Sequence, residues 1–244
     1  MADARRDGPV VLVHGAWHDA SCWDRVAREL EQRGRRAVAV DLPAGELGAE
    51  GYTDAVLAAV GVPVPAEPVV LVGHSLGGLT VPVVAQRLGP DRVAAMVLLA
   101  PLLPRPGASF ADVERADRRV MAEGFGHGQQ RHEDGTTSWP PAAARDGLYR
   151  GVAEESSPGV VADAVARLRP QSWAVRREVT PLDEWPRVPT AVVVCVDDRV
   201  VDPDGVRRHA RGLPGAELVE LPGGHFPMLT RPGELAGILA AYGS

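Results

Sequence analysis

A serine at the junction of an expected strand and an expected helix constrains this chain more than any other feature. The apolar run 69–72 is typical of a buried strand, and residues 79–88 are typical of a helix. Between them, Gly73, Ser75 and Gly77 form the pattern G-x-S-x-G. A sharp turn at this place needs small neighbours, and it exposes the serine hydroxyl beside the N–H groups at the start of the helix. The pattern predicts a nucleophilic serine.

A nucleophilic serine needs a base and an acid that orients the base, and two later loops offer them. His225 lies in a glycine-rich loop after an expected strand. Asp197 and Asp198 come directly after the apolar run that starts at 191. Because serine, aspartate and histidine follow in this order, each just past a strand, we predict a catalytic triad of Ser75, Asp198 and His225. Asp197 remains the alternative acid.

Strand and helix signals alternate along most of the chain. Apolar strands that alternate with helices predict an α/β fold with a mostly parallel, doubly wound sheet that is covered on both faces. The length of 244 residues fits one such core. We expect strands at 10–13, 36–41, 69–72, 93–99, 191–196 and 216–220, and helices at 21–32, at 53–60 with Thr53 as the N-terminal cap, and at 79–88.

The alternation stops in the middle of the chain. Residues 102–188 contain charged helical pieces at 112–122 and 160–169 instead. We therefore predict a helical cap at 102–188, inserted into a core formed by residues 1–101 and 189–244. Four aromatic residues in or near this insertion either form walls of a pocket or hold the cap on the sheet: Trp139, Tyr149, Trp173 and Trp185.

Charge and composition argue against several classes of function. The formal net charge is −6 without an acidic or basic block, so we expect no nucleic-acid or membrane partner. All 26 basic residues are arginine, which removes a lysine nucleophile from consideration. The start of the sequence lacks the apolar stretch of a secretory leader, and no run reaches membrane-spanning length, so we expect a cytoplasmic protein. Cys22 and Cys195 are expected to be buried and unbridged.

One group of residues resembles a metal site by composition alone. It consists of His127, His132, Glu133 and Asp134, whose spacing matches no regular helical or finger pattern. We expect a solvated loop there, and we expect no metal and no organic cofactor.

Several segments together resemble the α/β-hydrolase superfamily, and within it the plant methylesterase and hydroxynitrile lyase group with its bacterial relatives. The resemblance covers nearly the whole chain, apart from 7–9 and much of 104–158. It rests on 11–18 with Trp23, and on 38–43, 70–79, 168–171, 193–199 and 223–229.

The resemblance implies hydrolysis of a carboxylic ester through an acyl-enzyme intermediate. Ser75 would attack the ester carbonyl, His225 would accept its proton, and Asp198 would orient the imidazole. The family pattern favours Asp198 over Asp197, because the family's acid directly precedes the position of Arg199.

The same resemblance implies where the negative charge of the reaction would be held. The N–H of Leu76 and that of Ala16, or alternatively that of Gly15, would form the oxyanion hole. Trp17 and His18, which follow in the same loop, are expected to border the pocket.

Two positions depart from the lyase branch of the group. Lyases carry threonine and lysine where this chain has Gly15 and Phe226. Because the lysine handles the charge of cyanide, its replacement favours an esterase. We expect the glycine to leave room at the oxyanion loop and Phe226 to line a largely hydrophobic pocket. Small or aromatic esters are the expected substrates.

Other functions share the same residues. A biosynthetic enzyme that performs acyl transfer, elimination or cyclisation would use the same Ser75–His225 pair. A ligand receptor with residual hydrolase activity would keep the same fold. A homodimer is also left open.

Overall fold

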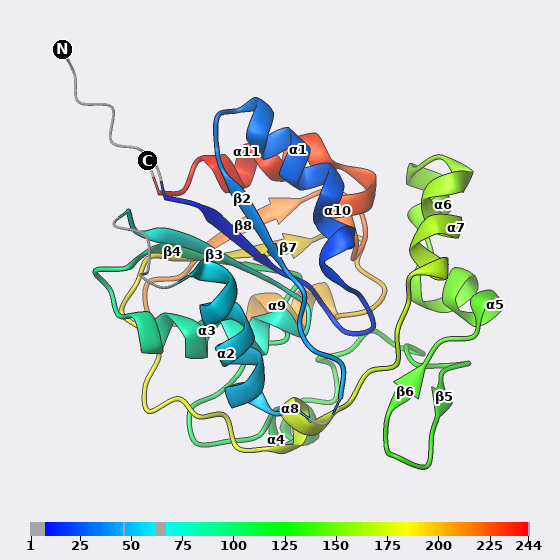
Figure 1. Cartoon of the computed structure of the whole chain (residues 1–244). Helices are drawn as coiled ribbons and strands as arrows, with labels where there is room; N and C mark the ends of the chain where they lie inside the picture. The colour runs from blue at the N-terminus through cyan, green and yellow to red at the C-terminus, as the bar shows by residue number, and fades with distance from the viewer. Residues whose placement is uncertain (1–7, 46, 62–66, 244) are drawn as a thin grey trace.

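A six-stranded, entirely parallel sheet forms the centre of the molecule (Figure 1). The structure is a computed structural model that describes residues 8–45, 47–61 and 67–243. The strand order is β2-β1-β3-β4-β7-β8, so the chain crosses over between neighbouring parallel strands through helices. The strands are β1 (Val10–Val13), β2 (Ala37–Val40), β3 (Val69–His74), β4 (Val93–Leu99), β7 (Thr190–Cys195) and β8 (Glu217–Leu221).

Helices cover both faces of this sheet, as the sequence predicts. Figure 1 shows α1 and α11 together on one face and α2, α3 and α9 on the other. A short 3₁₀ helix, η1, precedes α1, and α10 precedes α11. These elements are η1 (Ala20–Trp23), α1 (Asp24–Gln32), α2 (Ala49–Val60), α3 (Gly77–Leu88), α9 (Pro203–Ala210), α10 (Pro227–Thr230) and α11 (Pro232–Ala240).

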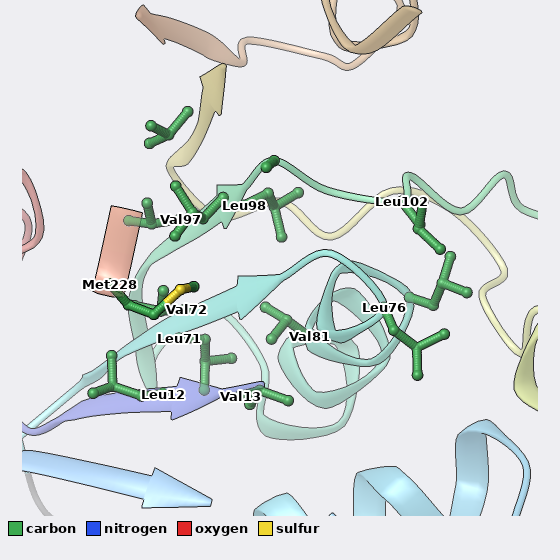
Figure 2. Close-up of a cluster of buried hydrophobic side chains, with 14 of the residues drawn as sticks. Leu12, Val13, Leu71, Val72, Leu76, Val81, Val97, Leu98, Leu102 and Met228 are labelled. Atoms are coloured by element: carbon green, nitrogen blue, oxygen red, sulfur yellow. The ribbon is translucent and has the colours of Figure 1, made fainter. Parts of the chain in front are cut away.

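The central strands consist mostly of apolar residues because both of their faces are covered. All residues of β1, β3 and β7 are buried. Figure 2 shows side chains of β1, β3 and β4 packed with Val81 of α3 and Met228 of α10. Full burial of one such side chain stabilises the fold by roughly 1.5–3 kcal/mol. This core holds the carboxyl ends of the strands in fixed positions.

A long segment joins β4 to β7 where the sequence predicts a cap. Figure 1 shows its hairpin β5–β6 and the helices α5, α6 and α7 beside the sheet, apart from the helices that cover its faces. Its elements are α4 (Phe110–Ala116), β5 (Gln130–Arg131), β6 (Thr137–Ser138), α5 (Pro141–Ala143), the π-helical turn η2 (Ala144–Leu148), α6 (Val152–Glu155), α7 (Pro158–Ala166) and α8 (Ala174–Arg177).

The prediction that Thr53 caps a helix is wrong. Helix α2 begins at Ala49, four positions earlier, and Thr53 is buried in its second turn. The carboxylate of Glu178, far away in the sequence, accepts the hydrogen bond of the Ala49 N–H. A residue that is distant in the sequence therefore caps the helix, in place of the expected local residue.

The helix expected at 112–122 is shorter than predicted. Helix α4 begins after Ser109, which forms a capping box with Asp112, and it ends at Ala116. Asp117 then leaves the helical conformation, and its carboxylate accepts a hydrogen bond from Arg208 of α9 at 2.9 Å. This ion pair joins the end of α4 to α9.

Both cysteines carry free thiols, as expected. Cys195 is buried at the end of β7, whereas Cys22 in η1 is only half-buried. In the described part of the chain, no helix has the length and apolar character needed to cross a membrane. Residues 1–7, which begin the stretch considered for a leader, lie outside the described residues.

Candidate active site

Ser75 follows directly after β3 in a backbone conformation that L-residues rarely adopt. Its φ is 51°, in the left-handed region. Its N–H donates to the carbonyl of Leu99 on the neighbouring strand at 3.0 Å, and its own carbonyl accepts from the Gly78 N–H at 2.9 Å. Hydrogen bonds on both sides hold the strained turn in place.

The glycines around Ser75 are needed because the turn is crowded. A Cβ at Gly73 would lie 2.6 Å from the carbonyl oxygen of Gly77. A Cβ at Gly77 would lie 2.8 Å from the carbonyl oxygen of Val13 on β1. Both distances are far below van der Waals contact, so the spacing G-x-S-x-G is a steric requirement of this turn.

His225 and Asp198 meet in a buried hydrogen bond. The two atoms, His225 Nδ1 and Asp198 Oδ2, are 2.6 Å apart, and the two side chains are 4% and 2% exposed. The other carboxylate oxygen of Asp198 accepts from the N–H groups of Val200 at 2.7 Å and Val201 at 3.0 Å. Because Asp198 only accepts, His225 Nδ1 carries the proton and Nε2 is left as the basic nitrogen.

Asp197 has a different partner. Its Oδ2 accepts from the Gly223 N–H at 3.2 Å, and its own N–H donates to the Gly223 carbonyl at 3.0 Å. Asp197 thus ties the end of β7 to the start of the loop that carries His225. In this geometry Asp198, not Asp197, touches the imidazole.

His74 contacts His225 through a hydrogen bond and through its ring. Its Nε2–H donates to the His225 carbonyl at 2.9 Å, and the two ring centroids are 4.6 Å apart. Burial lowers the pKa of His74 well below its usual value, so the ring is neutral. Among the described residues, no hydrogen bond joins the Ser75 hydroxyl to His225, a bond that often tightens only when substrate is bound.

The loop after β1 lies against Ser75. His14 Nδ1–H donates to the Gly15 carbonyl at 2.8 Å, and its Nε2 accepts from the Leu42 N–H at 3.0 Å. Burial lowers the pKa of His14, which keeps this neutral tautomer. Within the described residues, the N–H groups of Ala16 and Leu76 have no hydrogen-bond acceptor, so both can donate to a ligand.

Gly15 does not leave open space, contrary to the expectation. A Cβ at this position would lie 2.9 Å from Nδ1 of His74 and 3.0 Å from Cβ of Ser75. The glycine is needed because the loop passes so close to the serine.

A cavity of about 350 Å³ opens from Ser75 toward the inserted segment. Trp17, Phe110, Phe125 and Trp173 supply its aromatic walls. The lining residues are Ala16, Trp17, Ser75, Leu102, Phe110, Glu114, Met121, Phe125, Gly126, Gln129, Arg131, Gly135, Thr137, Trp173, Arg176, Arg177 and Val200.

Only one of the four aromatic residues predicted in or near the insertion lines this cavity. Trp173 does so, whereas Trp139 packs edge-on against Trp17, with ring centroids 5.7 Å apart. Tyr149 and Trp185 are buried elsewhere. No sequence signal separates a pocket wall from a packing contact.

His18 and Phe226 do not line the cavity either, although both were expected to. His18 Nδ1–H donates to the Ala16 carbonyl at 2.7 Å, and its Nε2 accepts from the Tyr149 hydroxyl at 2.7 Å. The Phe226 ring is buried among other rings, 4.9 Å from that of His225 and 4.8 Å from that of Tyr149. Phe226 therefore packs behind the imidazole.

The cavity lining includes charged residues, among them Glu114 and Arg176, so the pocket is less apolar than predicted. Glu114 Oε2 accepts from Arg176 Nε at 2.5 Å, and the guanidinium carbon of Arg176 lies 5.8 Å from the Trp173 ring centroid. Burial raises the pKa of Glu114, while Arg176 opposes that shift. The sequence analysis missed this pair, since its members lie on separate short helices, α4 and α8.

The histidines of the hairpin region form no metal site. His132 Nε2 is 2.8 Å from the Ser138 hydroxyl, and Asp134 accepts hydrogen bonds from Thr136. Among the described residues, no group of three or more His, Cys, Asp or Glu side chains is arranged to hold a metal ion.

The sequence is similar to those of known proteins. Residues 10–238 match the alpha/beta hydrolase family. The chain belongs to this family. It is 33% identical to a probable esterase of rice (Oryza sativa), PIR7A, over 94% of both chains. It is 29% identical to a carbendazim hydrolyzing esterase of Nocardioides sp., over 96% of this chain and 98% of the relative.

Solved structures show the same fold. A pyrethroid hydrolase from Sphingobium faniae superimposes with a TM-score of 0.78 at 25% identity, over 96% of both chains. The predicted α/β-hydrolase fold and the resemblance to plant methylesterases and bacterial esterases are confirmed. The chain is a carboxylesterase-like enzyme.

Because His18 is buried, we expect the stability of the fold to depend on pH. Burial lowers its pKa from 6.5 to about 4. Between these pH values the unfolded chain binds a proton at His18 that the folded chain does not. The contribution of neutral His18 to the free energy of unfolding is therefore complete above pH 6.5 and is lost as the pH falls toward 4. The free energy of unfolding should therefore fall by about 3 kcal/mol on account of this residue.

Urea denaturation of wild type and His18→Gln between pH 4 and 7.5 measures this contribution. The variant should show a shallower loss of stability below pH 6.5. His132→Gln, at an exposed position, is the control for removal of a histidine. Curves for wild type and His18→Gln that run parallel over the whole range would contradict the prediction.

Proposed function

We propose that this enzyme hydrolyses carboxylic esters of small or aromatic substrates through an acyl-enzyme formed on Ser75. The observation that carries the proposal is the buried hydrogen bond of 2.6 Å between His225 and Asp198, at the same edge of the sheet as Ser75. The esterase relatives support the reaction class. The cavity of about 350 Å³ is of a size for a small ester.

The proposed reaction has two halves. Ser75 Oγ attacks the ester carbonyl while His225 Nε2 takes its proton, and Asp198 stabilises the imidazolium that forms. The tetrahedral intermediate collapses, the C–O bond to the alcohol breaks, and His225 gives the proton to the leaving alcohol. Water then attacks the acyl-enzyme, with His225 as base again, and Ser75 is released with the acid.

The oxyanion of each intermediate would be held by backbone N–H groups. Leu76 donates from the start of α3, and Ala16 donates from the loop after β1. Gly15 is the alternative to Ala16, but only Ala16 lines the cavity together with Ser75. One such donor typically contributes a factor of roughly 10²–10³ in rate.

The division of the chain into core and cap is part of the same proposal. Residues 102–188 supply most of the cavity lining, whereas Ser75 and Ala16 come from the core. The cap therefore selects the substrate, and the core performs the chemistry. Replacement of the lyases' lysine by Phe226, which is buried and apolar, argues against cyanohydrin cleavage.

Replacement of the nucleophile tests the proposal most directly. Ser75→Ala should abolish hydrolysis of short p-nitrophenyl esters, because no other group can form the acyl-enzyme. A fluorophosphonate probe should label Ser75 in wild type and leave the variant unlabelled, as measured by mass spectrometry. Circular dichroism checks that the variant is folded. Undiminished hydrolysis by Ser75→Ala would overturn the proposal.

The two neighbouring carboxylates provide a matched comparison. Asp198→Asn should lower kcat by a factor on the order of 10⁴, because the amide favours the wrong histidine tautomer. Asp197→Asn should have a much smaller effect, since Asp197 bonds the Gly223 backbone. Steady-state kinetics on one ester measures both. The reverse ranking would move the acid to Asp197.

Substrate preference follows from the cavity. In a series of p-nitrophenyl esters from acetate to palmitate, kcat/KM should be highest for short or aromatic acyl groups, because the inserted segment closes the cavity to long chains. Mandelonitrile should release no cyanide above background. A maximum at the longest chain, or enzymatic cyanide release, would show that the cavity had been misinterpreted.

A further inference from the structure

Trp17 has the most unusual backbone of the loop after β1. Its φ is 64°, a left-handed conformation that bulky residues rarely adopt. It follows immediately after Ala16, the proposed oxyanion donor. A strained conformation of this kind persists only where the surrounding structure holds it from several directions. The groups that hold Trp17 therefore bear on the geometry of the proposed oxyanion hole.

Three residues of the inserted segment hold Trp17. Its backbone N–H donates to Oε1 of Gln171 at 3.2 Å, and its indole N–H donates to the hydroxyl oxygen of Thr137 at 3.0 Å. Its carbonyl accepts from the Arg169 N–H at 2.8 Å. The backbone donor, the backbone acceptor and the side chain of Trp17 are all bound by the same segment.

Thr137 and Gln171 also hold each other. Their backbones exchange two hydrogen bonds of 2.8 and 2.9 Å, which join β6 to the strand-like segment before α8. Both side chains belong to residues that are buried, with 2% and 7% exposure. The Thr137 hydroxyl oxygen accepts from the Trp173 indole at 2.8 Å as well, so both of its lone pairs are engaged.

The amide of Gln171 is oriented by its other end. Its NH₂ group donates to the Tyr52 hydroxyl at 3.0 Å and to the Ser172 carbonyl. With the nitrogen bound there, the oxygen faces the Trp17 N–H. The amide therefore has one orientation, in which Trp17 has an acceptor.

These contacts reach the oxyanion loop through one peptide group. The N–H of Trp17 and the carbonyl of Ala16 belong to the same peptide, and His18 Nδ1–H binds that carbonyl at 2.7 Å. The preceding peptide is held by His14, which donates to the Gly15 carbonyl. The Gly15 carbonyl and the Ala16 N–H share that preceding peptide, so His14 sets the direction of the N–H, while Trp17 and His18 hold the peptide on the other side of Ala16.

We propose that Thr137 and Gln171 are positioning residues for the esterase reaction. They hold Trp17 in its left-handed conformation and so fix the position of Ala16, whose N–H would bind the oxyanion. Neither residue touches the reacting atoms. The inference rests on the proposed function, because it requires Ala16 to be an oxyanion donor.

Thr137→Val tests the role of the hydroxyl, since valine has nearly the same shape but cannot accept the two indole N–H groups. We expect kcat to fall about 10- to 100-fold with KM unchanged, because a displaced donor weakens only the transition state. Thr137→Ser keeps the oxygen and should restore kcat to near the wild-type value. Thr190→Val is the matched control, because Thr190 is also buried and hydrogen-bonded but lies at the opposite end of β7.

An inhibitor that forms an oxyanion separates positioning from a general loss of structure. A trifluoromethyl ketone binds as an adduct of Ser75, whereas the corresponding alcohol binds without an oxyanion. Thr137→Val should weaken the ketone by the same factor as kcat and leave the alcohol unchanged. Gln171→Met removes the acceptor of the Trp17 backbone N–H and should have the same effect on ketone and alcohol binding. The test therefore does not fail if one of the two variants does not fold.

The outcomes distinguish this inference from the proposed function. If wild type is not labelled by a fluorophosphonate and does not bind the ketone, the proposed function fails. If wild type does both, but folded Thr137→Val and Gln171→Met keep kcat and ketone affinity, the positioning role alone is overturned. A loss of thermal stability without loss of kcat, or equal weakening of ketone and alcohol, likewise overturns it.

Discussion

The structure depends on one geometric constraint: all strands of the sheet are parallel, so their carboxyl ends meet at one edge. Ser75 follows β3 there, Asp198 follows β7, and His225 follows β8. In the described part of the chain, the non-glycine residues with positive φ are Trp17, Ser75 and Ala100, and each follows shortly after the end of a strand on this edge. Strain is thus concentrated where the rigid strands end, because the buried core beneath can hold it.

Around Ser75, burial controls which nitrogen can act as a base. His14, His18 and His74 are buried, and in each case burial lowers the pKa. Each neutral ring donates a hydrogen bond to a backbone carbonyl: that of Gly15, of Ala16 or of His225. Because these imidazoles stay neutral and their protons are engaged, they fix the loops on either side of the serine. They also place no positive charge beside His225, which must gain a proton in the proposed reaction.

The sequence predicts features that are local and misses those that are not. The turn at Ser75, the strands and the aspartate–histidine loops were predicted because each needs only neighbouring residues. The cap at Thr53 was predicted wrongly, because the N–H of Ala49 at the start of the helix donates to Glu178, 129 positions away. The contacts of Thr137 and Gln171 with Trp17 left no signal, since they join residues 120 and 154 positions apart. The cavity is likewise formed by residues that are far apart in the sequence, so the sequence pattern does not show which aromatic side chains line it.

The inserted segment therefore has two roles that a lid alone would not have. It forms the charged and aromatic walls of the cavity, with Trp173 and Arg176 in direct contact. Through Thr137 it also binds the indole of Trp17, next to the proposed oxyanion donor. Trp173 shares this Thr137 oxygen, so one hydroxyl joins a wall of the cavity to the oxyanion loop. A substrate that displaces Trp173 would disturb the acceptor of Trp17, and a substrate that fits would leave it intact. In the proposed reaction, substrate choice and rate would be coupled through Thr137, because its oxygen binds both Trp173, a wall of the cavity, and Trp17, the neighbour of the proposed oxyanion donor.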